Sequence, residues 1–144
     1  MLSVWKRCSA LGLATWLGLL GAAPASAWQH DFERGVDLYR VASGGAVLSL
    51  VCDPNKVYGD QSESALMVQL GADDDFSGQV RIAFPDETVI DVQAERGRVA
   101  KRVVAAETWG TLLDGLREHD TLELTMKGSS RRIETGEGQN FTCN

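Results

Sequence analysis

Three cysteines are the residues of this 144-residue sequence whose chemistry depends most on the compartment that holds the protein. Cys8 lies in an apolar N-terminal segment, which leaves Cys52 and Cys143 as a pair in the rest of the chain. The pair has no C-x-x-C spacing, so the pattern does not favour redox catalysis. In an exported domain such a pair is typical of one disulfide. The bridge would close a loop of about 90 residues and stabilise the fold by roughly 4–5 kcal/mol.

A run of basic residues is the second feature of the sequence that could have a chemical role, in this case the binding of a charged partner. Arg96, Arg98, Lys101 and Arg102 lie within seven residues of an otherwise acidic sequence. Such a cluster could bind an envelope protein, or an anionic glycan or lipid headgroup. The alternative is a strand whose charged edge deters edge-to-edge aggregation. Both interpretations stay open, and we take this run as the candidate partner-binding site.

Residues suited to catalysis or metal binding are sparse. His30 and His119 are far apart in the sequence, and no G-x-S-x-G motif accompanies them. The acidic triplet 73–75 lacks the alternating acids, the glycine and the closing glutamate of a calcium-binding loop. We therefore predict a protein that is not an enzyme, with no catalytic residue, no metal and no cofactor. A hydrolase that uses His119 is the less favoured alternative.

The first 27 residues have the three parts of a secretory signal peptide. Lys6 and Arg7 precede an apolar segment, and Ala25-Ser26-Ala27 is a small-residue cleavage signal. Cleavage there would leave residues 28–144, enough for one domain. Cleavage would lower the number of basic residues from 14 to 12 and leave all 20 acidic residues, so the net charge would be −8. We expect a periplasmic or secreted protein that binds no nucleic acid and keeps no transmembrane segment after cleavage.

Alternating apolar residues predict strands over most of the remaining chain. We expect strands at 35–41, 46–52, 65–70, 79–84, 88–93, 99–104 and 121–127 and from Arg131, with His30 in a loose N-terminus and a hairpin turn at 71–78. A stripe of Trp109, Leu112, Leu113 and Leu116 predicts one late amphipathic helix, with Thr108 as its N-cap. The predicted fold is mainly β, a small antiparallel sandwich or open barrel with one helix and a single disulfide.

The layout of these elements resembles a known group of exported proteins. A tryptophan begins the predicted mature chain, a GG hairpin leads to "LSLVC", and "LLDGLREHDTLELTM" precedes a cysteine near the end. This is similar to small periplasmic proteins of the invasion-associated locus B type and their uncharacterised alphaproteobacterial relatives. The resemblance implies a disulfide-containing β-sandwich without known catalysis and with envelope or host-interaction roles. "SGQVRIAF" also approaches the S-G-x-x-[YF] element of periplasmic lysozyme inhibitors, with Arg81 at the aromatic position.

The combined prediction is a small periplasmic, non-enzymatic binding or accessory protein of the cell envelope. The alternative is a protein inhibitor of a lysozyme-type cell-wall hydrolase, acting through the loop at 53–64 or the turn at 71–78. The sequence indicates no oligomeric state and names no specific ligand.

Overall fold

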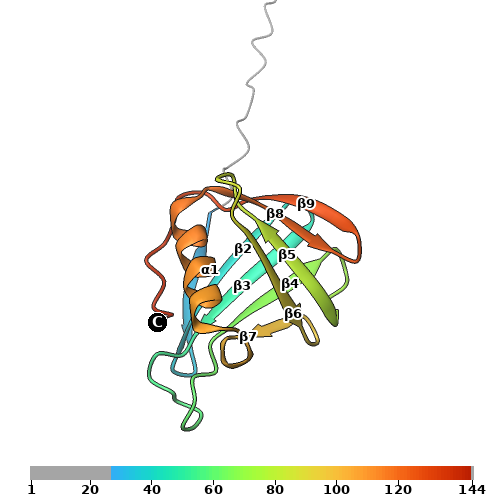
Figure 1. Cartoon of the computed structure of the whole chain (residues 1–144). Coiled ribbons are helices and arrows are strands. Elements are labelled where there is room, and N and C mark those ends of the chain that lie inside the picture. Colours follow the sequence, from blue (N-terminus) through green and yellow to red (C-terminus); the bar gives the residue numbers. More distant parts are fainter. Residues whose placement is uncertain (1–26, 144) are drawn as a thin grey trace, which may run out of the picture.

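The computed structural model describes residues 27–143 (Figure 1). The predicted signal peptide, residues 1–27, lies outside the described residues except for its last position. The described chain forms nine strands, one α-helix and one short 3-10 turn. The prediction of a mainly β fold is therefore confirmed.

The strands form two antiparallel sheets that pack against each other in a sandwich-like arrangement. In the five-stranded sheet the order is β1 (Gln29–Glu33), β2 (Val36–Ser43), β3 (Ala46–Cys52), β4 (Ala65–Leu70) and β7 (Arg98–Ala100). In the four-stranded sheet the order is β6 (Val89–Ala94), β5 (Gly78–Ala83), β8 (Thr121–Met126) and β9 (Ser129–Glu134). The 3-10 turn covers Lys101–Val103, and helix α1 covers Ala106–Glu118.

Strand β3 lies at the centre of the larger sheet, as its sequence predicts. Leu48, Leu50 and Cys52 are fully buried on the face that meets the second sheet, whereas Val47 and Val51 are half-buried on the other face. Strands β5, β6 and β8 alternate in the same way and direct their apolar side chains into the shared core. The period-two pattern thus determines which face of each strand is buried.

Helix α1 lies beside the two sheets (Figure 1) and buries the predicted apolar stripe: Trp109, Leu112, Leu113 and Leu116. The helix begins three residues earlier than a cap at Thr108 requires. Ala105 occupies the N-cap position and makes no side-chain capping bond, so the prediction for Thr108 is wrong. Packing of the stripe into the core, rather than a cap, stabilises this helix.

Three other local predictions are wrong. The N-terminus is not loose, because Gln29–Glu33 forms β1, which pairs with β2 along its whole length. Residues 71–78 do not form a hairpin turn, because β4 and β5 belong to different sheets. The strand expected at 99–104 ends at Ala100, where the Val104 amide donates to the Lys101 carbonyl and closes a 3-10 turn.

Candidate functional site

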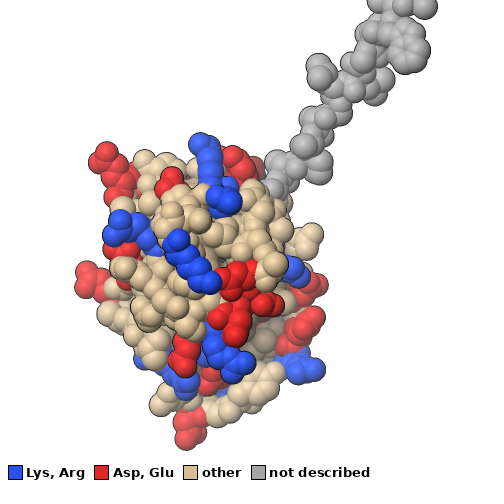
Figure 2. Space-filling model, turned by 90° about the vertical axis from the view of Figure 1, so that its right-hand side faces the viewer, with Lys and Arg blue, Asp and Glu red and all other residues tan. Residues whose placement is uncertain are grey.

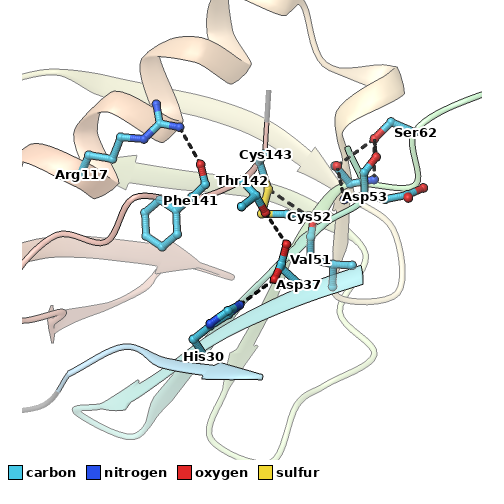
Figure 3. The surroundings of a disulfide bond; sticks show 11 residues. His30, Asp37, Val51, Cys52, Asp53, Ser62, Arg117, Phe141, Thr142 and Cys143 are labelled. Carbon is cyan, nitrogen blue, oxygen red and sulfur yellow. Dashed lines mark hydrogen bonds and ion pairs between the residues drawn. A yellow bond between two sulfur atoms is a disulfide. The ribbon is translucent and has the colours of Figure 1, made fainter. Parts of the chain in front are cut away.

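The predicted disulfide between Cys52 and Cys143 is present and fully buried (Figure 3). It joins the end of β3 to the C-terminal tail, residues 135–143. The tail is also anchored by Phe141, whose buried ring packs edge-on against Trp28 at 5.2 Å and Tyr39 at 5.0 Å between ring centroids. The tail therefore closes one side of the core, and both a covalent bond and aromatic packing hold it there.

A carboxylate beside the disulfide ties the tail to the first two strands. One oxygen of Asp37 accepts a hydrogen bond from the Thr142 hydroxyl at 2.7 Å, and the other lies 2.7 Å from Nε2 of His30. The Thr142 hydrogen bond, followed by that of His30, holds the pKa of Asp37 below its ordinary value. In a catalytic triad the imidazole stands between hydroxyl and carboxylate. Here the carboxylate stands between the other two groups, so the arrangement is a structural clamp (Figure 3).

The predicted basic cluster is split between three local structures. Arg96 lies in the turn between β6 and β7, Arg98 in the edge strand β7, and Lys101 and Arg102 in the 3-10 turn. The structure brings all three arginines, but not Lys101, to the lining of a single cleft of about 860 Å³. The cleft is also lined by Met67, Asp74, Asp75, Gln93, Glu95, Ala100 and Val103.

Each arginine of the cluster has a carboxylate partner from a distant part of the chain. Arg96 lies 3.3 Å from Asp75, and both side chains are largely exposed. Arg98 donates to Glu63 at 2.9 Å, and Arg102 lies 3.8 Å from the same carboxylate. The cleft is therefore surrounded by charges of both signs. The face drawn in Figure 2 likewise interleaves acidic and basic side chains.

The loop at 53–64, which follows the disulfide-bonded Cys52, is organised by a buried carboxylate. Asp53 is fully buried and accepts the backbone amides of Val57 at 2.9 Å and Glu63 at 3.0 Å. Its own backbone amide donates to Ser64 Oγ, and its carbonyl accepts from Ser62 Oγ. The two ends of the loop are thus fastened together, as in a compact Ω-loop.

This bracing was not predicted from the sequence, which indicated only a polar loop through which an inhibitor could act. A signal was present. An aspartate that directly follows a buried strand and precedes a proline is typical of side-chain caps on loop amides.

The two histidines lie on different elements, β1 and the end of α1, and contact different residues. His119 caps the C-terminus of α1, and its Nε2 lies 3.4 Å from Asp86 while its ring stacks on Phe84. Within residues 27–143, no group of three or more histidine, cysteine or acidic side chains is placed to hold a metal ion. No helix in the same range is long and apolar enough to cross a membrane.

Comparisons with known proteins find no relative of this chain. No protein-family model, no curated protein and no solved structure matches it. Function is therefore inferred from the residues of the chain itself.

Proposed function

We propose that this chain is an exported, non-enzymatic protein of the cell envelope that acts by binding another protein in the periplasm. The observation that carries the proposal is the cleft at β7, which gathers Arg96, Arg98 and Arg102 with carboxylates from distant segments. The buried disulfide supports export, since such bonds persist in oxidising compartments. Membership of the invasion-associated locus B type stays a prediction.

The charges around the cleft favour a protein over an anionic polymer as the partner. A uniformly anionic glycan or lipid surface would meet Asp74, Asp75 and Glu95 at the same cleft as the arginines. A protein surface offers both signs of charge and can match both. Met67, Ala100 and Val103 add apolar area to the lining, and 70% of Val103 is exposed.

The test is a charge reversal in the 3-10 turn of the basic cluster, from which Arg102 lines the cleft. We expect proteins captured from envelope extract by the wild-type chain to be lost from a Lys101→Glu/Arg102→Glu variant. A matched control, Arg131→Glu/Arg132→Glu, reverses two adjacent charges on β9 in the other sheet and should keep them. Captured proteins are then purified, and their affinities are measured directly at several salt concentrations.

Two probes test the anionic alternatives with the same variants. Phosphatidylglycerol vesicles and heparin should bind neither the wild type nor the control. Binding to either probe that is lost on reversal of Lys101 and Arg102 would replace the protein partner with an anionic one. Capture of no protein at any salt concentration would reject the proposal.

A further inference from the structure

Three exposed apolar side chains lie on two segments that meet, the end of β1 with its turn into β2 and the 53–64 loop. Phe32 is 67% exposed, Tyr58 58% and Val57 44%. The Tyr58 hydroxyl donates to the Arg34 carbonyl at 2.9 Å, and Val57 packs against Gly35. Phe32 lies near the end of β1, two residues before Arg34, which begins the turn; two residues of extended chain span about 7 Å. We call Phe32, Val57 and Tyr58 the apolar tip.

The loop that carries the apolar tip is held at four points. The disulfide fixes its start at Cys52, and the buried carboxylate of Asp53 binds two of its amides. The Tyr58 hydroxyl fixes its tip to Arg34, and Glu63 fixes its end to Arg98. A loop already fixed in its bound shape loses little conformational entropy when it binds. Rigid bracing around exposed apolar side chains is therefore the arrangement expected of a preformed docking element.

We propose that the apolar tip is the anchor of the protein–protein interface and inserts into an apolar pocket of the partner. The proposal rests on the proposed function and names the contact that supplies most of the affinity. Buried aromatic anchors of this kind dominate the energetics of most interfaces. Asp31, Glu33 and Asp60 lie in the same two segments as the tip, together with Arg34 and Lys56, so the rim of the partner pocket is expected to carry charges of both signs.

Net charge decides between a protein and the other surfaces that an apolar tip could enter. Residues 27–143 hold all 20 acidic residues and 12 of the 14 basic ones, a net charge of −8. That charge repels anionic lipid headgroups, and it also repels a second copy of the chain. A different protein with a positively charged surface is attracted by it.

The 53–64 loop runs from the apolar tip, beside the turn between β1 and β2, toward the cleft at β7, and β1 and β7 form opposite edges of the five-stranded sheet. Glu63 ends the loop and pairs with both Arg98 and Arg102, which line the cleft. A partner that spans the 53–64 loop can contact both the apolar tip and the charged cleft. In that division of roles the tip supplies affinity, and the cleft supplies orientation and association rate.

The experiment uses the full chain in cells that export it, with the photo-crosslinking residue p-benzoylphenylalanine placed at Tyr58 or, separately, at Val103, an exposed residue of the cleft lining. We expect both positions to give an adduct with the same protein. That protein is then purified, and its affinity for defined variants is measured. Val57→Ser/Tyr58→Ser should weaken binding about tenfold or more. Val89→Ser on β6, where the valine is 52% exposed, is the matched control and should change nothing.

A further variant separates the anchor from the brace. Tyr58→Phe keeps the ring but removes the hydrogen bond to Arg34, and it should retain most of the affinity. If it binds as weakly as the serine variant, the hydroxyl acts as a brace and the ring is not the anchor.

The remaining outcomes distinguish the two proposals. An adduct at Val103 but none at Tyr58, or an affinity unchanged in Val57→Ser/Tyr58→Ser, overturns the anchor and leaves the proposed function standing. An adduct at Tyr58 with lipid or with a second copy of the chain also overturns the anchor. No protein adduct at either position overturns both proposals.

Discussion

Two glycines on α1 respond in opposite directions to the same substitution. In a helix interior, glycine is about 0.8–1.0 kcal/mol less favourable than alanine. A methyl group at Gly110 would meet nothing within 4 Å, so Gly110→Ala should raise the free energy of unfolding by about 1 kcal/mol. At Gly115 the methyl would lie within 2.7 Å of three ring carbons of Phe84, where ordinary contacts begin at 3.4 Å. Overpacking of this kind costs about 1–3 kcal/mol.

Phe84 is only 4% exposed, so its ring has little room to move away from Gly115. The overpacking cost should therefore lie near the top of its range, and Gly115→Ala should lower the free energy of unfolding by about 1–2 kcal/mol after the helix gain is subtracted.

Urea unfolding of the two single variants, followed by far-UV circular dichroism, measures both values. A double variant, Gly115→Ala/Phe84→Leu, tests the cause, because a smaller side chain should relieve the clash and make the two changes strongly non-additive. If Gly110→Ala and Gly115→Ala stabilise the protein equally, α1 does not pack on Phe84 as described.

Three further predictions concern the segments that close the fold. Replacing both Cys52 and Cys143 with alanine opens a bridge between residues 91 apart, for which loop-closure entropy gives a loss of about 4.6 kcal/mol in guanidinium unfolding. A loss below about 2 kcal/mol would show that non-covalent contacts suffice to hold the tail. Since the pKa of Asp37 is lowered in the fold, its contribution is present above about pH 4 and disappears as the pH falls through the lowered value. Asp37→Asn should therefore show a flatter loss of stability with acid, and a profile like the wild type would contradict the clamp. Asp53→Ala leaves two loop amides unpaired and should cost about 1–3 kcal/mol. Amide exchange should then quicken in the 53–64 loop but not in β8, and unchanged exchange in the loop would refute the bracing.

The strands could be predicted from the sequence wherever apolar and polar residues alternate. β3 matches its predicted bounds, 46–52, and the stripe on α1 is buried as its spacing requires. β1 could not be predicted in this way, because all five of its side chains are exposed and its sequence has no apolar alternation. It exists because β2 offers an edge to pair with. The hairpin expected at 71–78 failed for a related reason, since local sequence does not say which sheet the next strand will join.

The candidate site was only partly predictable. The cysteine pair could be read from composition, because two remaining cysteines allow one pairing. The basic run was visible, but its partners were not: Asp75 and Glu63 lie 21 and 35 residues away from the arginines that they bind. The apolar tip combines residues from two segments that are separate in the sequence, the end of β1 and the loop between β3 and β4.

By itself, the sequence determined the fold class, the buried face of each amphipathic strand and the sulfur pairing. The fold class and the buried faces follow from the local spacing of apolar residues, and the sulfur pairing follows from the number of cysteines. None of these requires knowledge of contacts between distant residues. Only the tertiary structure decided that the arginines have carboxylate partners, that hydrogen bonds of Asp53 brace the 53–64 loop, and that two glycines on one helix have opposite roles. Those properties depend on contacts between residues that are distant in the sequence. Such contacts form only when both sheets, the helix and the tail pack together.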